Sequence, residues 1–355
     1  MAAGLVQRVF VASPRGYCAG VERAVETVEH ALALYGAPVY VRKQIVHNAH
    51  VVDDLERRGA IFVEDETDAP VGAILVLSAH GVAPAVFDRA AARRQTTIDA
   101  TCPLVTKVHV QARRYAAEGR RIVLIGHAGH EEVVGTMGEA PEAILLVENV
   151  EDAEALDLPV DTPLAYITQT TLSVDETAEI IQVLKRRFPQ IHAPQREDIC
   201  YATSNRQWAV KEMLDQIELL LVIGSRNSSN SNRLVEVASA AGVGAYLIED
   251  ETGIDERWLE DVQTVGLTSG ASAPERLVVR VCDWFRERGC ATSVRSRRPT
   301  RMSSFDCPSS CVAQRYLPLD GLQEAREPPR PRPDRARQRA RASRHLRTDC
   351  LAHPF

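Results

Sequence analysis

At 355 residues, the chain is long enough for two or three domains with a substantial hydrophobic core. It has no run of roughly 20 apolar residues and no secretory leader at its start, so we expect no membrane association and a cytoplasmic location. In such a chain, eight cysteines favour metal binding or catalysis over disulfides. The net charge of −6 divides into −14 for residues 1–289 and +8 for residues 290–355, and the acidic main part argues against nucleic-acid binding.

Residues 1–289 alternate short apolar runs with amphipathic stretches, which predicts an α/β fold with mainly parallel sheets. After an N-terminal run at 8–13, the predicted strands are residues 39–41, 73–78, 122–126, 144–147, 165–168, 219–224 and 265–268. The run at 219–224 is apolar almost throughout, as expected when helices cover both faces of a sheet. Two Ser-x-x-Glu sequences, at 173–176 and 272–275, predict helices that begin with capping boxes.

A cysteine followed by two polar loops occurs three times in the chain. The cysteines stand directly before predicted helices, at Cys18, Cys102 and Cys200. The first polar loops follow 28 or 29 residues later and contain His47, His130 and Ser228. The second loops are residues 78–81, 168–171 and 269–272. This repeat predicts pseudo-threefold-related α/β domains around a central cluster, and the expected domains are residues 1–99, 100–197 and 198–289.

The repeated cysteines suit a metal cluster. Cysteine thiolates bind iron–sulfur clusters, and three of them on a four-iron cubane leave one iron open. A helix N-terminus also favours the thiolate. We therefore predict one [4Fe-4S] cluster held by Cys18, Cys102 and Cys200. Two alternatives are that the cysteines are small buried hydrophobic residues, or that the metal is zinc, whose typical spacing occurs only at Cys307 and Cys311 in the C-terminal region.

The remaining polar loops suit an anion. His47, His80 and His130 can donate to phosphate oxygens, and other donors can complete a diphosphate pocket. These further donors are Ser228, Ser229, Asn230 and Ser272. Each histidine also has a structural interpretation, and Ser229, Asn230 and Ser272 have one as helix caps. Glu132 lies among glycine, alanine and valine, which predicts a raised pKa and a general acid rather than a solvated helix-start glutamate, whereas Glu131 is expected to be exposed.

Eight motifs resemble those of the 4-hydroxy-3-methylbut-2-enyl diphosphate reductases. They are Pro14-Arg-Gly-Tyr-Cys18-Ala-Gly-Val, Ile45-Val-His47-Asn48, Ser78-Ala-His80-Gly-Val, Asp99-Ala-Thr-Cys102-Pro-Leu-Val, Gly126-His-Ala-Gly-His130-Glu-Glu132-Val, Thr168-Gln-Thr170-Thr-Leu-Ser, Asp198-Ile-Cys200-Tyr-Ala-Thr and Asn227-Ser-Ser-Asn230-Ser-Asn-Arg. The resemblance covers about residues 8–289. It implies the reductive dehydroxylation of (E)-4-hydroxy-3-methylbut-2-enyl diphosphate to isopentenyl and dimethylallyl diphosphates, the last step of the methylerythritol phosphate route.

The resemblance also implies roles for individual residues. The three cysteines would ligate the cluster, whose open iron binds the substrate hydroxyl, and the donors named above would hold the diphosphate. Thr170 would position the hydroxyl, and Glu132 would relay protons. A ferredoxin or flavodoxin is implied as electron donor, because no flavin or nicotinamide motif is present. Two other functions remain open: an iron–sulfur hydro-lyase, and a cluster-based sensor with a basic nucleic-acid-binding tail.

Residues 290–355 depart from the family pattern. They hold 14 arginines, no lysine, six acidic residues and eight prolines, and the closing strand expected of the family is not recognisable. This composition, without apolar periodicity, predicts disorder. An aberrant terminus and a basic interaction tail are the two explanations.

Overall fold

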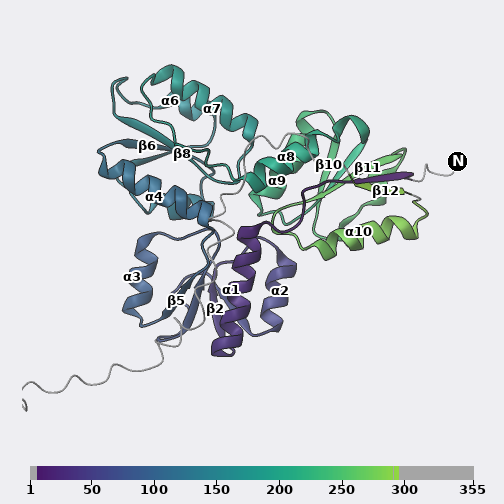
Figure 1. Ribbon diagram of the computed structural model, residues 1–355, viewed down its shortest axis with the longest axis horizontal. Helices are drawn as coiled ribbons and strands as arrows, with labels where there is room; N and C mark the ends of the chain where they lie inside the picture. The colour runs from purple at the N-terminus through teal and green to yellow at the C-terminus, as the bar shows by residue number, and fades with distance from the viewer. Residues whose placement is uncertain (1–5, 291, 296–355) are drawn as a thin grey trace, which may run out of the picture. The chain divides into compact units, whose positions relative to one another are not determined.

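The computed structural model describes residues 6–290 and 292–295. The disorder predicted for the C-terminal region and the Cys307–Cys311 pair fall outside this range. The described residues belong to one compact unit with three separate sheets (Figure 1). All strand ladders among these residues are parallel, which confirms the predicted α/β fold class. None of the described helices combines the length and apolar character needed to cross a membrane.

The first sheet has the strand order β3-β2-β4-β5. Its strands are β2 (Val39–Arg42), β3 (Ala60–Val63), β4 (Ile74–Leu77) and β5 (Thr96–Asp99). The helices between them along the chain are α2 (Ala49–Arg57) and α3 (Pro84–Ala92), and α1 (Ala19–Tyr35) precedes β2. In β4, Val76 joins one hydrophobic cluster while Leu75 and Leu77 join another. Alternate side chains of one strand are therefore buried on opposite faces of the sheet.

The second sheet has the order β7-β6-β8. Its strands are β6 (Arg121–Ile125), β7 (Ile144–Val147) and β8 (Leu164–Thr168). Its helices are α4 (Pro103–Ala117), α5 (Glu131–Met137), α6 (Val150–Ala155) and α7 (Val174–Arg187). Helix α7 begins as predicted, because the Ser173 hydroxyl accepts a hydrogen bond from the Glu176 backbone N–H at 3.3 Å. Val123 and Ile125 pack on one face of the sheet, and Ile122 packs on the other.

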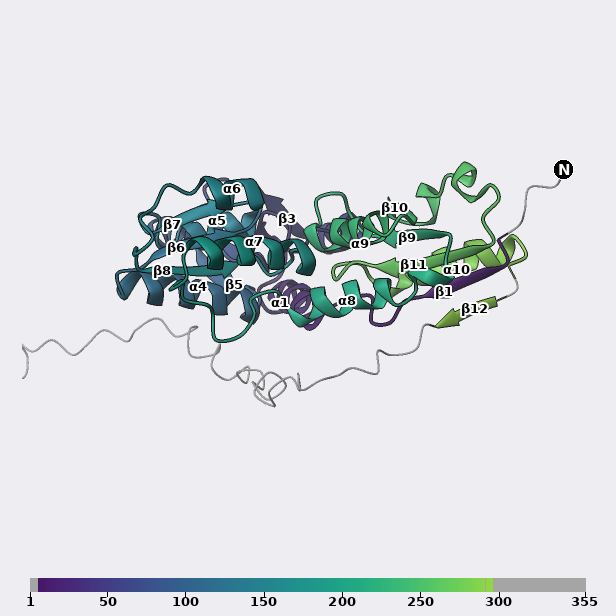
Figure 2. The same ribbon diagram turned by 90° about the horizontal axis from the view of Figure 1, so that it is seen from above.

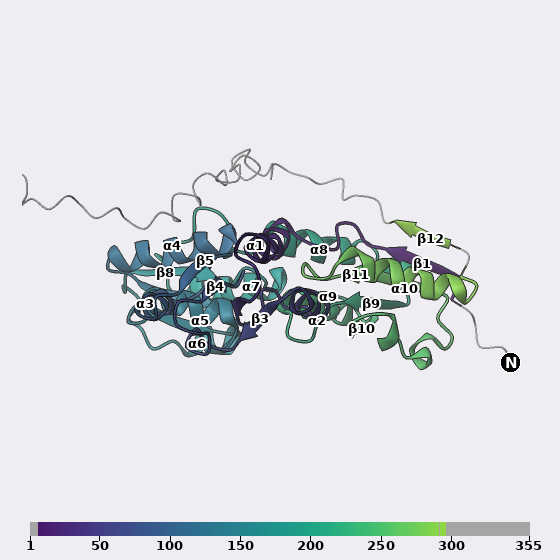
Figure 3. The same cartoon turned by 90° about the horizontal axis from the view of Figure 1, so that it is seen from below.

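The third sheet corrects two of the domain boundaries. Its order is β10-β9-β11-β1-β12, and Figures 2 and 3 show β1 between β11 and β12. The strands are β1 (Arg8–Val11), β9 (Leu219–Ile223), β10 (Gly244–Ile248), β11 (Thr264–Ser269) and β12 (Thr292–Arg295). Strand β1 thus belongs with the third sheet, although it was expected in a first domain of residues 1–99. A closing strand does exist at β12, beyond the expected limit of 289. The other boundaries and the pseudo-threefold relation stay predictions.

Helices and short turns complete this part of the chain. They are α8 (Tyr201–Lys211), η1 (Leu214–Gln216), α9 (Ser229–Ala240), η2 (Glu251–Gly253), η3 (Glu256–Leu259) and α10 (Glu275–Glu287). In β9, Leu219 and Leu221 pack on one face, and Leu220 packs on the other. This confirms that the apolar run at 219–224 is covered on both sides.

Candidate functional site

The polar loops of all three sheets line one pocket. Its walls include every site residue predicted from the sequence: Cys18, His47, His80, Cys102, His130, Glu132, Thr170, Cys200, Ser228, Ser229, Asn230 and Ser272. Space free of protein atoms amounts to about 680 Å³, part of it open to solvent. Loops at the carboxyl ends of parallel strands gather at one edge of each sheet, which explains why distant motifs meet.

Each pocket cysteine occupies the N-cap of a long helix. Cys18 precedes α1 and its Sγ accepts a hydrogen bond from the Val21 backbone N–H at 3.4 Å. Cys200 precedes α8 and accepts from the Thr203 backbone N–H at 3.3 Å. Cys102 precedes α4 without a side-chain capping bond. All three thiols are free. The partial positive charge of the helix ends is therefore directed at sulfur from three sides.

A gap between the sulfur atoms fits a bound cluster. Gly20 lies where any side chain would intrude, because a Cβ atom there would be 2.7 Å from Cys102 Sγ and 3.8 Å from Cys18 Sγ. Burial raises the pKa of the Cys102 thiol to about 12 and also raises the pKa of Cys200. Without a metal these thiols therefore keep their protons. The residues present fit an iron–sulfur cluster: three free thiols face a space kept open by a glycine.

Three histidines form a second group in the same pocket. The His47 and His80 rings are stacked with centroids 4.1 Å apart, and the His130 ring stands edge-on to both, at 5.7 and 5.9 Å. Burial, followed by the neighbouring imidazoles, lowers the pKa of His47 to about 2 and that of His130 to about 4. The Glu132 backbone N–H donates to His130 Nδ1 at 3.2 Å, so the proton of neutral His130 is on Nε2.

Glu131 is less exposed than the sequence predicted. It is partly buried, and its Oε2 lies 3.1 Å from His80 Nδ1. Burial works to raise the Glu131 pKa, but the hydrogen bond and charge of His80 outweigh it, and the pKa is lowered. One ring nitrogen each of His47 and His80 and one carboxylate oxygen of Glu131 lie within 4.8 Å of one another. The cause of this difference is that α5 begins at the pocket, where its first residue lies against His80.

The hydroxyl and amide side chains are held in place by neighbouring loops. The Ser272 hydroxyl donates to the His47 carbonyl at 2.9 Å rather than capping α10, whose N-cap is Pro274. Ser229 donates to the Thr171 carbonyl at 2.9 Å. Asn230 Oδ1 accepts from the Ala271 backbone N–H at 2.9 Å.

The N-cap of α9 is Ser228 rather than Ser229 or Asn230, and its Oγ accepts from the Ser231 backbone N–H at 3.3 Å. The capping box predicted at Ser272 is therefore wrong. Helix α10 starts two residues later than that motif requires, because its N-cap is Pro274.

Glu132 is only 2% exposed, so the solvated alternative for this residue is wrong. Its Oε1 accepts from the Thr170 backbone N–H at 2.6 Å, and its Oε2 accepts from the Thr170 hydroxyl at 3.1 Å. Burial raises the Glu132 pKa to about 7, although both Thr170 bonds oppose the shift. A carboxyl with this pKa can hold or release a proton near neutral pH, as a general acid requires.

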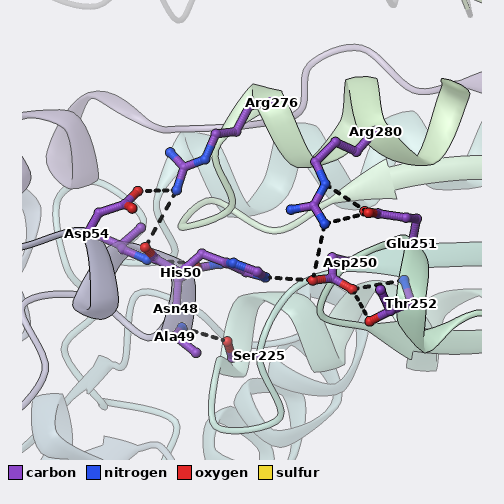
Figure 4. A network of polar contacts seen from close by, with 11 residues as sticks. Asn48, Ala49, His50, Asp54, Ser225, Asp250, Glu251, Thr252, Arg276 and Arg280 are labelled. Carbon is purple, nitrogen blue, oxygen red and sulfur yellow. Dashed lines mark hydrogen bonds and ion pairs between the residues drawn. The ribbon is translucent and has the colours of Figure 1, made fainter. Parts of the chain in front are cut away.

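A polar network fixes the loop that carries His47 against the third sheet (Figure 4). Helix α2 begins two residues after His47, and its His50 Nε2 lies 3.1 Å from Asp250 Oδ2 at η2. Arg276 of α10 pairs with Asp54 of α2. The Ala49 backbone N–H also donates to Ser225 Oγ at 3.4 Å. These contacts hold His47 opposite the serine and asparagine donors of α9.

Thr203, which lines the pocket, and Gln44 and Asn227, which lie next to His47, were not predicted as site residues from the sequence. The Thr203 hydroxyl lies 3.1 Å from Cys200 Sγ and accepts from Asn230 Nδ2 at 3.1 Å, which links the thiols to the anion donors. Asn227 Nδ2 donates to Gln44 Oε1 at 2.8 Å and lies 3.2 Å from His47 Nδ1. Thr203 follows Cys200 by one helical turn, and that spacing is a usable signal. Gln44 and Asn227 meet only in the folded chain.

Comparisons with known proteins identify the family of this chain. The family model described as LytB protein matches residues 9–286. A curated 4-hydroxy-3-methylbut-2-enyl diphosphate reductase of Acidothermus cellulolyticus is 62% identical over 81% of this chain and 84% of its own length. That of Streptomyces avermitilis is 58% identical over 81% of this chain and 86% of its own length.

A solved E-1-hydroxy-2-methyl-but-2-enyl-4-diphosphate reductase from Plasmodium falciparum is 38% identical, with a TM-score of 0.81, covering 91% of this chain and 100% of its own. A second solved structure, of (E)-4-hydroxy-3-methyl-but-2-enyl diphosphate reductase, is 28% identical, with a TM-score of 0.57 over 79% of this chain and 100% of its own. The family match covers strands of all three sheets, without β12, and every predicted site residue. The chain therefore belongs to the LytB family.

Proposed function

We propose that this LytB-family enzyme reduces (E)-4-hydroxy-3-methylbut-2-enyl diphosphate to isopentenyl and dimethylallyl diphosphates. The observation that carries this function is the meeting, in one pocket, of three free thiols, a cluster of three histidines and a buried carboxyl group with a pKa near 7. The family's iron–sulfur chemistry and the reductase names of the curated relatives support the same reaction.

Cys18, Cys102 and Cys200 would hold one [4Fe-4S] cluster with an open iron. When bound, the cluster supplies electrons and a site for the substrate hydroxyl. The diphosphate is held at the other end of the pocket by imidazole, hydroxyl and amide donors. These donors are His47, His80, His130, Ser228, Ser229, Asn230 and Ser272. Each hydrogen bond to a charged oxygen contributes about 1.5–3 kcal/mol, so the set binds a small dianion or trianion well.

The chemical balance of the reaction assigns a role to Glu132. The allylic C–O bond breaks, the oxygen leaves as water, and a C–H bond forms at the allyl group, which consumes two electrons and two protons. Glu132 holds a proton inside the pocket, and Thr170 fixes the carboxyl by its backbone N–H and hydroxyl. Thr170 would then orient the substrate hydroxyl beside this acid. The electrons come from a small redox protein, a ferredoxin or flavodoxin.

Two measurements on anaerobically purified protein test this function. Iron and inorganic sulfide should each approach about four per chain. Turnover of the allylic diphosphate should require an electron source. Zinc in place of iron would contradict the cluster, and turnover without reductant would favour the hydro-lyase. No observation on the described residues favours the lyase or the sensor.

A further inference from the structure

Arg206 is a buried cation without an anionic partner of its own. It lies on α8, six residues after Cys200, and only 3% of it is exposed. No ion pair joins it to a carboxylate among the described residues, although most other arginines of the fold form such pairs. Burying a guanidinium without a compensating charge is strongly unfavourable, so its position requires an explanation.

The hydrogen bonds of Arg206 place it between two cysteine-bearing segments. Nη2 donates to the Gly16 carbonyl at 2.6 Å, two residues before Cys18. Nη1 donates to the Ala202 carbonyl at 2.8 Å, two residues after Cys200. Nε is buried and has no hydrogen-bond partner. Both acceptors are neutral, so these bonds orient the guanidinium without balancing its charge.

The groups whose negative charge would act on Arg206 are Cys18 and Cys200 of the pocket and the neighbouring Tyr201. Burial lowers its pKa, and negative charge on Cys18 and Cys200, followed by Tyr201, opposes that shift. Three thiolates around an oxidised cubane core give an overall charge of about −1, which becomes about −2 after one-electron reduction. A fixed positive charge in a region of low dielectric constant stabilises the more negative state more strongly.

We propose that Arg206 is the buried counter-charge of the cysteine-bound cluster and raises its reduction potential. The inference rests on the proposed cluster but goes beyond the proposed reaction, because it concerns how readily the enzyme accepts an electron. Arg206 is a positioning and electrostatic residue, since it touches the segments that carry Cys18 and Cys200 rather than the substrate. The alternative is a purely structural cross-link between the Gly16 loop and α8.

Redox titration of the holoenzyme, followed by electron paramagnetic resonance, separates these two explanations. In Arg206→Met, the ratio of reduced to oxidised cluster at a fixed potential should fall about tenfold, equivalent to a shift of about 59 mV for one electron. Arg206→Lys keeps the charge but loses the planar fork, so its potential should stay near that of the wild type. If Arg206→Met loses the cluster, Arg206→Gln removes the charge while keeping a donor for the carbonyls.

Arg23 supplies a matched control. Its Nη1 donates to the carbonyl of Thr101, the residue before Cys102, at 2.8 Å, but the side chain is exposed and screened by water. Arg23→Met should therefore leave the potential nearly unchanged. Equal shifts in Arg206→Lys and Arg206→Met, or no shift in a charge-removing variant beyond that of Arg23→Met, would overturn the inference while the proposed function stands. A wild-type protein without a cluster would contradict the proposed function itself.

Discussion

The two ends of the pocket respond to burial in opposite directions. At the cysteine end, burial raises thiol pKa values, as at Cys102, where the pKa is about 12. At the histidine end, burial lowers imidazole pKa values, to about 2 at His47 and about 4 at His130. Desolvation disfavours the charged form in both places, so Cys102 at one end and His47 and His130 at the other favour their neutral forms in the free protein. A bound metal cation would favour thiolates at the cysteine end, and a bound anion would favour protonated imidazoles at the histidine end.

This contrast indicates that the ends can be disabled separately. The cysteine end depends on sulfur ligands and on open space at Gly20, whereas the histidine end depends on donors supplied by several loops. Glu132 connects the two ends: its carboxyl group accepts a hydrogen bond from Thr170, and its backbone N–H donates one to His130. Variants at the three places should therefore affect iron content, turnover and anion affinity in different combinations.

The largest effect is expected at the cysteine end. In Cys102→Ser, iron and sulfide in anaerobically purified protein should fall from about four per chain to near background, because a hydroxyl is a poor cluster ligand. Cys282→Ser is the control: this free cysteine is buried in α10 and does not line the pocket, so its loss should leave iron unchanged. Full iron retention in Cys102→Ser would contradict the ligand assignment.

Glu132→Gln should separate chemistry from both kinds of binding. The amide keeps the shape of the side chain but cannot release a proton, so turnover should fall about 10²–10⁴-fold while iron content and substrate affinity persist. Glu131→Gln, at the neighbouring position, should retain far more activity. Wild-type-like turnover of Glu132→Gln with the cluster intact would rule out the proton relay.

The same carboxyl group predicts the pH dependence of the wild type. A general acid must be protonated before it acts, and burial raises the Glu132 pKa to about 7. The protonated fraction, and with it kcat/KM, should therefore fall as pH rises above about 7 and level off below it. A pH–rate profile that is flat between about pH 6 and pH 9 would contradict this assignment.

At the histidine end, His47→Ala should weaken anion binding without loss of iron. One hydrogen bond to a charged oxygen contributes about 1.5–3 kcal/mol, so the Kd for pyrophosphate, measured by calorimetry, should rise about 10- to 100-fold. His192→Ala, at a histidine outside the pocket, should bind pyrophosphate like the wild type. A comparable loss of affinity in both variants would indicate a general loss of structure.

The smallest effect concerns acid stability. Because the folded-state pKa of His47 lies below its unfolded value of about 6.5, the unfolded chain binds more protons between those values, and stability is lost as pH falls below about 6.5. His47→Asn removes this term. Between pH 7 and pH 5, the free energy of unfolding should therefore fall less in His47→Asn than in the wild type. The difference between the two decreases should be on the order of 1 kcal/mol. Equal acid sensitivity in urea titrations of the two proteins would refute a strongly lowered pKa.

Much of the fold and site could be predicted because the signals are local. Strand β9 is a continuous apolar run, and the cysteine spacing repeats along the chain, so both are visible without tertiary information. The strands that were not predicted from the sequence lie at sheet edges. Strands β3 and β5 have partners on one side only, and β5 reads Thr-Thr-Ile-Asp, with little of the apolar character on which strand prediction depends.

The sequence by itself determined the parallel α/β class, the family resemblance and the candidate cysteine, histidine, hydroxyl, amide and carboxyl residues that meet in the pocket. These follow from periodicity, helix starts and motif chemistry, all of which act over a few residues. Only the tertiary structure decided that β1 pairs with β11 and β12, that Ser272 bonds to His47, and that Glu131 faces His80. It also placed Arg206 between the segments that carry Cys18 and Cys200. These contacts join residues far apart in the chain, so the folded backbone must exist before their energies can be assigned.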